Sequence, residues 1–136
     1  MVKPASFHFL TQTFDSSETN LLVQIAESAQ IYLHEKQPFL KPGYTLQELS
    51  EDIHSSPVLT SKAINRVLKT NFNELMNEQR VKHFIRLARL ERSEHLTLWG
   101  IAQEAGFGNK VTFYKAFKKQ MGTTPKVYLA NTARTS

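Results

Sequence analysis

The sequence predicts an all-α fold of two helix-turn-helix lobes joined by a long helix. Three observations favour it. Apolar residues recur along most of the chain at the spacing of one helix face. Gly and Pro are scarce, five of each in 136 residues. One pattern, a short helix, a turn and a second helix, occurs in residues 45–72 and again in residues 97–125, and such an internal repeat indicates two units of similar structure.

The two copies match at their apolar positions. TLQELSEDIHSSPVLTSKAINRVLKTNF in the first copy lies over TLWGIAQEAGFGNKVTFYKAFKKQMGTTP in the second, with one extra residue in the turn of the second copy. We therefore expect the same positions to be buried in both. The matched pairs are Leu46 and Leu98, Leu49 and Ile101, Ile64 and Phe117, and Leu68 and Met121.

Before the first copy, the sequence predicts a tail and one helix. Residues 1–17 lack helical periodicity and are expected to be a tail or linker. Ser17 is the expected N-cap of a helix over residues 18–35, which Pro38 stops. Residues 39–44 contain Pro42 and Gly43 and are expected to form a connector. The expected inward face of the helix consists of Leu21, Leu22, Ile25, Ala29, Tyr32 and Leu33.

The first copy begins with a strong local signal. Thr45 as N-cap and Glu48 three residues later predict a capping box. The turn covers residues 54–57, and Pro57 suits the first position of the next helix, which is predicted to run through Thr70.

The segment between the copies predicts a single helix from Asn73 to about Leu90. It is long enough to join two lobes stiffly. Its expected buried positions are Leu75, Met76, Phe84, Leu87 and Ala88.

In the second copy, Thr97 caps a helix over residues 98–105, but Gly100 stands where the first copy has Glu48, so the capping box is lost. Gly106 ends the helix with a left-handed turn that lets Phe107 pack inward. A helix over residues 110–121 follows and Gly122 closes it. A short last helix is predicted from Pro125 to about Ala130.

Charge is polarised along the chain. Residues 1–59 hold three basic and seven acidic residues, a net of −4, whereas residues 60–136 hold fourteen and five, a net of +9. A basic half of this kind is expected of a protein that binds a polyanion, although a merely solvated basic face is an equally good interpretation of charge alone. No cysteine is present, no apolar run has the length of a membrane span, and no signal peptide is evident. We expect a cytoplasmic protein without membrane contact.

The sequence offers no basis for catalysis. The five histidines have no metal-ligand spacing, and no nucleophile elbow or phosphate-binding glycine loop occurs. We therefore expect neither an enzyme nor a bound metal or other cofactor.

Residues 97–128, TLWGIAQEAGFGNKVTFYKAFKKQMGTTPKVY, resemble the C-terminal helix-turn-helix region of AraC/XylS transcription regulators in their IA, GF, TF, FKK and G-x-TP elements. LSEDIHSSPVLTSKAIN is similar to the first helix-turn-helix of that family and NFNELMNEQRV to the start of its linker helix. KQPFLKPGYTLQEL is similar to the segment that precedes them in members fused to sensor or membrane domains. An ordered pair with a helix between is a specific pattern.

The resemblance implies two homeodomain-like three-helix lobes. The implied divisions are a tail at 1–17, a first lobe at 18–72, a linker helix at 73–92, a second lobe at 93–131 and a tail at 132–136. Recognition helices of such lobes enter neighbouring major grooves, about 34 Å apart. The implied partner is double-stranded DNA, with RNA polymerase and a fused effector or sensor domain missing from this chain as further candidates.

The residues opposite each apolar face are expected to meet DNA. Lys suits guanine, Asn adenine, and Val a thymine methyl, whereas Tyr114 has an equally good interpretation as a packed ring. The predicted base contacts are Val58, Ser61, Lys62, Asn65, Asn109, Lys110, Val111, Tyr114 and Lys115. The predicted phosphate contacts are Thr45, Arg66, Thr97, Lys118, Lys119 and Lys126, and for any single Lys a solvated side chain is the alternative.

Two departures from the family pattern stand out. Phe84 occupies a position that is usually a small Ala, and Ala88, one turn later, a position that is usually a large aliphatic, an exchange that can preserve volume. Trp99 stands at a usually polar position, either as a cover for apolar surface or as a contact for a partner.

The prediction is therefore a sequence-specific DNA binder that regulates transcription. The alternative is a helical protein-interaction module with a basic face. We expect the C-terminal part of a longer regulator, and a free-standing small activator is the alternative.

Overall fold

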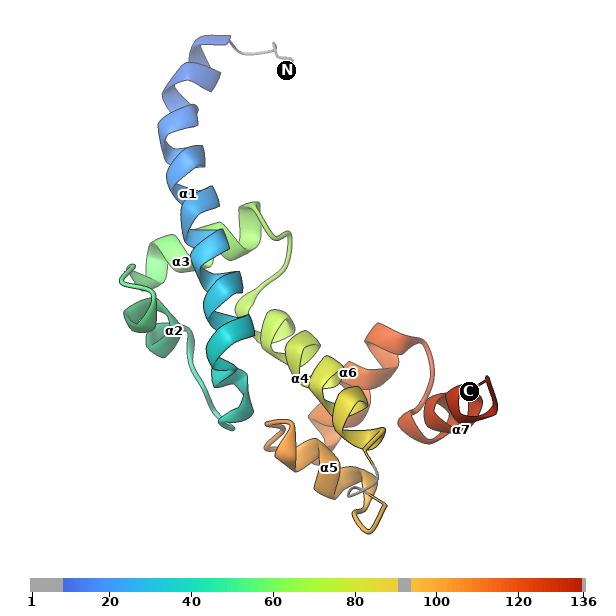
Figure 1. Ribbon diagram of the computed structural model, residues 1–136. Coiled ribbons are helices and arrows are strands. Elements are labelled where there is room, and N and C mark those ends of the chain that lie inside the picture. The colour runs from blue at the N-terminus through green and yellow to red at the C-terminus, as the bar shows by residue number, and fades with distance from the viewer. Residues whose placement is uncertain (1–8, 91–93, 136) are drawn as a thin grey trace. The chain divides into compact units, whose positions relative to one another are not determined.

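The structure, a computed structural model, describes residues 9–90 and 94–135 (Figure 1). These residues contain seven α-helices, one short 3-10 helix and no strand, which confirms the predicted all-α fold. The elements are α1 (Phe9–Lys36), η1 (Pro38–Leu40), α2 (Leu46–Asp52), α3 (Pro57–Arg66), α4 (Phe72–Ala88), α5 (Leu98–Glu104), α6 (Lys110–Met121) and α7 (Pro125–Thr135). No helix in this part of the chain is both long and apolar enough to span a bilayer.

The chain forms two compact units. Unit 1 holds α1, α2 and α3, and unit 2 holds residues 37–44 together with α4, α5, α6 and α7. The connector between α1 and α2 thus belongs to unit 2, and the chain passes between the units three times.

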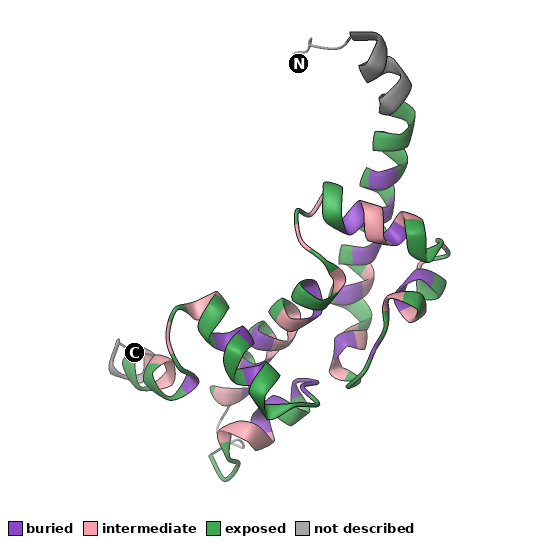
Figure 2. Ribbon diagram, turned by 180° about the vertical axis from the view of Figure 1, so that it is seen from behind, coloured by how far each residue is buried: buried purple, intermediate pink, exposed green. Residues whose placement is uncertain are grey.

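In unit 1, one face of α1 packs against α3. Leu22, Ile25 and Ala26 of α1 contact Ala63 of α3, and all four are buried. The apolar residues around them are half-buried, namely Ile53, Leu59, Val67 and Leu68. Figure 2 shows buried and exposed residues alternating along these helices, as expected of helices that are covered on one side.

Helix α1 differs from the prediction at its start. It begins at Phe9, and Ser17, the expected N-cap, lies exposed inside it. No Gly or Pro occurs between Phe9 and Lys36, so nothing in the sequence interrupts the helix before Ser17. The predicted helix start at Glu18 was therefore wrong, and residues 1–8 of the predicted tail or linker lie outside the described part of the chain.

Helix α3 ends at Arg66 rather than at the predicted Thr70. Lys69 takes a left-handed conformation with φ of 58°, which ends the helical path. The N–H of Thr70 donates to the carbonyl of Ile64 at 3.3 Å, so this carbonyl of the last turn has a partner. Apolar periodicity continues beyond the helix because Val67 and Leu68 still pack on the core after the backbone has turned.

The core of unit 2 is rich in aromatic rings. Phe84 of α4 lies 4.8 Å from Phe113 and 5.6 Å from Phe117, measured between ring centroids, and Phe107 lies 5.1 Å from Phe113. All four rings are buried. The large side chain at position 84 therefore fills the space between α4 and α6, whereas Ala88 is only half-buried at the edge.

The connector is fastened to unit 2 by its backbone. Arg80 of α4 donates from Nε to the carbonyl of Phe39 at 2.7 Å and from Nη2 to that of Lys41 at 3.3 Å. Phe39 is buried. Gly106 approaches the connector so closely that a Cβ at this position would lie 2.2 Å from the Phe39 oxygen.

Two helix ends differ slightly from the prediction. Helix α4 stops at Ala88 instead of Leu90, and α7 continues past Ala130 to Thr135.

Candidate nucleic-acid interface

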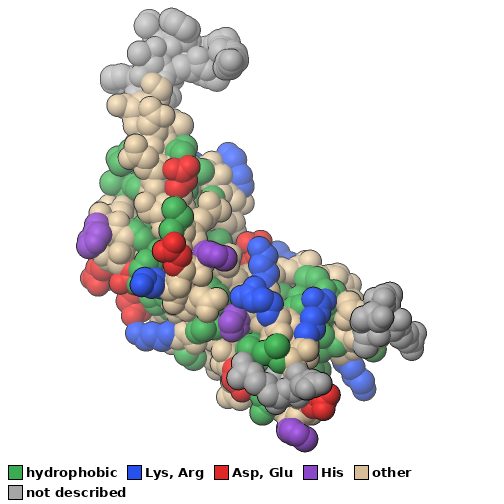
Figure 3. Space-filling view, in the orientation of Figure 1, with side chains coloured by type: hydrophobic (Ala, Val, Ile, Leu, Met, Phe, Trp, Pro, Cys, Tyr) green, Lys and Arg blue, Asp and Glu red, His purple; other side chains and the backbone are tan. Residues whose placement is uncertain are grey.

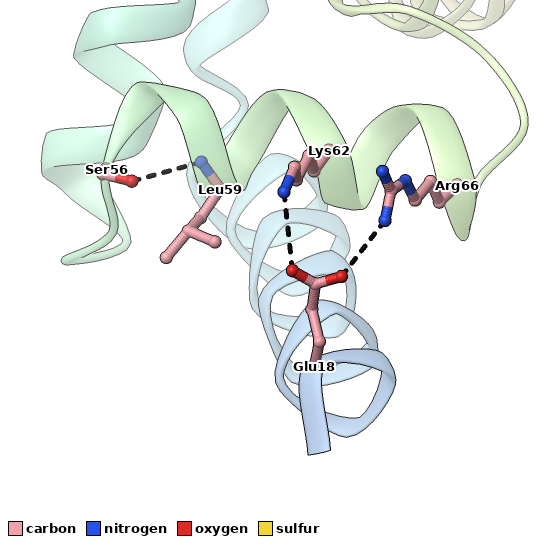
Figure 4. A network of polar contacts seen from close by, with 5 residues as sticks. All are labelled: Glu18, Ser56, Leu59, Lys62 and Arg66. Carbon is pink, nitrogen blue, oxygen red and sulfur yellow. Dashed lines mark hydrogen bonds and ion pairs between the residues drawn. The ribbon is translucent and has the colours of Figure 1, made fainter. Parts of the chain in front are cut away.

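The first hairpin, α2 and α3, is set by caps at both helix starts. The N–H of Thr45 donates to Glu48 Oε2 at 2.9 Å, and the N–H of Glu48 donates to Thr45 Oγ1 at 3.1 Å, which confirms the capping box. Ser56 caps α3 by accepting from the N–H of Leu59 at 3.1 Å (Figure 4). Pro57 occupies the first turn, as predicted.

Helix α3 has one buried and one exposed face. Thr60, Ala63 and Ile64 are completely buried. The predicted base contacts Val58, Ser61, Lys62 and Asn65 follow the i, i+3, i+4, i+7 spacing of a single face. Val58 is 68% exposed although it is apolar. Asn65 donates from Nδ2 to the carbonyl of Ser61 at 2.9 Å, which holds its amide along the helix.

The second hairpin, α5 and α6, repeats this construction. Thr97 Oγ1 accepts from the N–H of Gly100 at 2.9 Å, and the reciprocal bond of a capping box is absent because Gly100 has no side chain. Gly106 has φ of 105°, which confirms the predicted left-handed turn, and Gly122, which closes α6 as predicted, has φ of 77°. Phe107 packs inward, as predicted.

Helix α6 presents most of the predicted base contacts. Phe113, Ala116 and Phe117 face the core. The residues on the opposite side are exposed, namely Lys110, Val111, Tyr114, Lys115 and Lys118. Val111 is 61% exposed. The ring of Tyr114 lies 4.8 Å from that of Phe113, and the residue is still 38% exposed, so it combines a packed ring with an outer surface.

Several predicted contacts already have partners within the chain. Asn109 Oδ1 accepts from the N–H of Thr112 at 2.9 Å and caps α6. Its amide nitrogen is left as the group available to a base. The hydroxyls of Thr45 and Thr97 act as caps, as described above.

Three of the predicted basic contacts form ion pairs. Glu18 of α1 accepts from Lys62 Nζ at 3.4 Å and from Arg66 Nη1 at 3.1 Å (Figure 4). In unit 2, Lys119 Nζ lies 2.6 Å from Glu74 Oε1. Within the part of the chain whose side chains the structure describes, Lys110, Lys115, Lys118 and Lys126 form no ion pair. Figure 3 shows basic and acidic side chains interspersed on one face.

Local sequence patterns do not predict these ion pairs. Glu18 is separated by 44 residues from Lys62 and by 48 from Arg66, and local spacing rules do not extend over such distances.

The side chain of Trp99 lies against the core of unit 2. It is half-buried against the unit 2 core, with its ring 6.4 Å from that of Phe113, which favours the predicted role as a cover for apolar surface.

Three shifted pKa values belong to packing rather than to the exposed faces of α3 and α6. Burial lowers the pKa of Arg80, which holds the connector. Burial and the nearby Arg86 lower the pKa of His83. Burial and a hydrogen bond to Asp52 raise the pKa of Tyr32.

Two hairpins of the same construction, each with one helix buried on one side and carrying polar and basic groups on the other, define a helix-turn-helix protein. A family described as a helix-turn-helix domain matches residues 49–131. The chain belongs to this family, the AraC-type helix-turn-helix proteins, which are DNA-binding transcription regulators.

Relatives agree with this assignment. The chain is 27% identical over 126 residues to HTH-type transcriptional regulators from Staphylococcus aureus strains COL and N315. The match covers 89% of this chain, which spans only about 15% of the length of those relatives.

Solved structures agree on the fold. A DNA-binding transcriptional dual regulator from Escherichia coli K-12 matches with a TM-score of 0.65 and 19% identity, over 81% of this chain and 93% of that one. A protein of unknown function from Listeria innocua matches with a TM-score of 0.58 and 25% identity, over 73% and 90%.

Proposed function

We propose that this chain recognises a specific duplex sequence by placing α3 and α6 in two neighbouring major grooves. The observation that carries the proposal is the shared geometry of the hairpins. Each buries one side of its second helix and carries hydrogen-bonding and apolar groups at one-face spacing on the other side, which is exposed on α6 and, on α3, exposed at Val58 and Asn65 and half-buried at Ser61 and Lys62. The predicted separation of the two helices is one turn of DNA, about 34 Å.

Helix α6 is proposed as the more strongly bound of the two. Lys110 and Lys115 donate to guanine O6 and N7, Val111 contacts a thymine methyl, and Tyr114 contacts a base through its exposed edge. Asn109 adds an amide N–H donor. These groups sit on the exposed face of α6 or at its cap.

Helix α3 is proposed to read DNA with Val58, Ser61, Lys62 and Asn65. It offers fewer unpaired cations than α6 because Lys62 is held by Glu18. A larger share of its specificity is therefore expected to come from DNA shape. The proposed phosphate contacts are Arg66, Lys118, Lys119, Lys126 and the helix starts at Thr45 and Thr97.

We propose two further partners, a fused effector or sensor domain and RNA polymerase. We also propose that the protein acts in the cytoplasm. The support is that regulators of greater length match this chain over a small part of themselves.

The test is selection of binding sites from randomised duplex, followed by titration of variants on the selected site. Lys115→Ala should lose about 1 to 3 kcal/mol of binding free energy and relax base choice at one position. The matched control is Lys82→Ala, an exposed lysine of α4 outside both hairpins, which should change little. If Lys115→Ala binds both the selected and the random duplex as tightly as the parent does, the proposed role of Lys115 is rejected. If the parent at micromolar concentration retards no duplex in a gel shift, a protein-interaction module is favoured instead.

A further inference from the structure

The cations of α3 are already occupied in the protein without DNA. A single carboxylate, Glu18, receives one contact on each oxygen, from Lys62 at 3.4 Å and from Arg66 at 3.1 Å (Figure 4). The two cations lie four residues apart on one face of α3, and Glu18 reaches them from α1. The carboxylate thus bridges both basic side chains that α3 contributes to the proposed interface.

Unit 2 shows a related arrangement at one position. Glu74, at the start of α4, holds Lys119 of α6 through both oxygens, at 2.6 and 2.8 Å. In each unit the acid belongs to the helix that precedes the hairpin. The difference is that α6 keeps Lys110, Lys115 and Lys118 outside ion pairs of the described residues, whereas α3 has both Lys62 and Arg66 paired.

The pairs of Glu18 are weak enough to exchange. Side-chain exposure is 39% for Lys62, 58% for Arg66 and 44% for Glu18, so water screens both contacts. A surface ion pair of this kind changes an equilibrium constant by a factor of at most about five. The phosphates of duplex DNA offer about one negative charge per 1.7 Å of helix axis and can replace a single carboxylate.

We propose that Glu18 competes with DNA for Lys62 and Arg66 and so sets the affinity of α3 for duplex. The inference rests on the proposed function, since it requires α3 to meet DNA. In the protein alone the carboxylate contacts both cations and offsets one of their two positive charges. On binding, the cations transfer to DNA and Glu18 is released to water. Glu18 thereby lowers the affinity of α3 for any duplex. Helix α6 dominates the first contact, because its Lys110, Lys115 and Lys118 form no ion pair with the described residues.

The test is a thermodynamic cycle of four proteins, the parent, Glu18→Gln, Lys62→Gln with Arg66→Gln, and all three changes together. The probe is a random-sequence duplex of about 30 base pairs, long enough for two neighbouring grooves. We expect Glu18→Gln to tighten binding about threefold to tenfold at roughly 0.1 M salt, and the gain to shrink at roughly 0.5 M because salt screens the pairs. In the protein without the two cations, the Glu18 change should have no effect.

The matched control is Glu27→Gln. Glu27 is exposed on the same helix, and no ion pair of it occurs among the described residues. It removes the same charge about 13 Å further along the axis, so its effect on affinity should stay below about twofold. Circular dichroism of each variant checks that the fold is kept.

The outcomes of this test separate the proposed role of α3 in DNA binding from the inference that Glu18 competes with DNA. If the variant without Lys62 and Arg66 binds duplex as the parent does, α3 does not meet DNA through these residues and the proposed role of α3 is rejected together with the inference. If that variant binds more weakly but Glu18→Gln binds no more tightly than the parent, only the inference is overturned. An equal gain from Glu18→Gln in both backgrounds also overturns it, because the effect is then one of net charge.

If Glu18→Gln loses its fold, Glu18→Ser takes its place in the cycle with the same expected gain. Glu74 and Lys119 test whether a similar competition operates at α6. Glu74→Gln should tighten binding by a smaller factor, about twofold to fivefold, since one cation is released. The gain should vanish in the presence of Lys119→Gln. A folded Glu74→Gln protein that binds no more tightly than the parent, although Lys119→Gln weakens binding, would reject this competition at α6, whereas the Glu18 cycle decides it at α3.

Discussion

The two hairpins follow the same backbone course but fill it with different side chains. In unit 1 the N–H of Ser55 donates to the carbonyl of Ser50 at 2.8 Å, and in unit 2 the matched N–H of Phe107 donates to Ala102 at 3.0 Å. At four matched positions of the two hairpins the side chains differ in size and polarity. The matched pairs, unit 1 first, are His54 and Gly106, Ser55 and Phe107, Thr60 and Phe113, and Lys69 and Gly122.

The difference shows which features the hairpin requires and which it tolerates. The left-handed conformation is kept at both turns, with φ of 58° at His54 and Lys69 and of 105° and 77° at the glycines. The buried position in the middle of the second helix is kept as well, since Thr60 and Phe113 are both fully buried. The volume is not kept, because unit 2 has a phenylalanine ring where unit 1 has a threonine, and among the residues whose burial is described the core around α3 is aliphatic. We expect unit 2 to depend more on each core side chain.

The largest expected effect on stability comes from the matched buried positions Thr60 and Phe113. Phe113→Ala should lower the free energy of unfolding by about 3 to 5 kcal/mol, because the ring contacts Phe84, Phe107 and Phe117. Thr60→Ala, which loses a methyl and the Oγ1 bond to the carbonyl of Ser56, should cost about 1 to 2 kcal/mol. Urea titration gives both values. Trp99, the single tryptophan, packs on the core of unit 2. Its fluorescence should therefore change more in Phe113→Ala than in Thr60→Ala. Equal losses for the two variants would contradict the contrast between the cores.

The next effect concerns the turn. Gly106→Ala should lower stability by about 2 kcal/mol or more, because the new Cβ would meet the Phe39 oxygen and would lie 2.9 Å from Leu40 Cα. The matched change in unit 1, His54→Gly, should raise stability by about 0.5 to 1 kcal/mol, since His54 is exposed and loses only its left-handed strain. Thermal unfolding measures both.

Gly122→Ala is the control for this pair. Its φ is 77° and no atom lies within 4 Å of the added Cβ, so only backbone strain remains, about 1 kcal/mol. If Gly106→Ala costs no more than Gly122→Ala, crowding by the connector is not what requires glycine at position 106.

The smallest effect concerns the caps. Glu48→Gly should lose about 1 kcal/mol by removing the capping box and adding backbone freedom. Gly100→Glu should gain at most about 1 kcal/mol, because the new Cβ lies 3.2 Å from Thr97 Oγ1 and the hydroxyl must shift slightly. Chemical denaturation of both variants gives the comparison. A loss on Gly100→Glu would mean that the second hairpin start has no room for the side chain that the first one carries.

Features with local causes could be predicted from the sequence. The Thr45 capping box, Pro57 in the first turn of α3 and the turns at Gly106 and Gly122 depend on residues within a few positions of each other. Burial of Ala63 on α3 and of Phe113 and Ala116 on α6 followed from periodicity, whereas burial of the polar Thr60 did not. Burial of Leu49 with Ile101, and of Ile64 with Phe117, followed from the repeat and is confirmed.

Features that depend on distant partners could not be predicted. Glu18 meets α3 across more than forty residues, and Arg80 meets a carbonyl of the connector 41 residues away. Ser17 has the chemistry of a cap, but helix α1 continues through it because no breaker precedes it. Val67 and Leu68 keep the apolar rhythm of α3 after the helix has ended, so periodicity overestimates its length.

The connector also imposes an order on synthesis. Phe39 leaves the ribosome well before Arg80 and long before Gly106, the two residues against which its segment is seated in unit 2. At about 5 to 20 residues per second, the nascent chain carries this ring for several seconds without its site. A fragment that starts at Thr45 would never receive it, and its C-terminal unit would fold around a gap where the ring of Phe39 belongs.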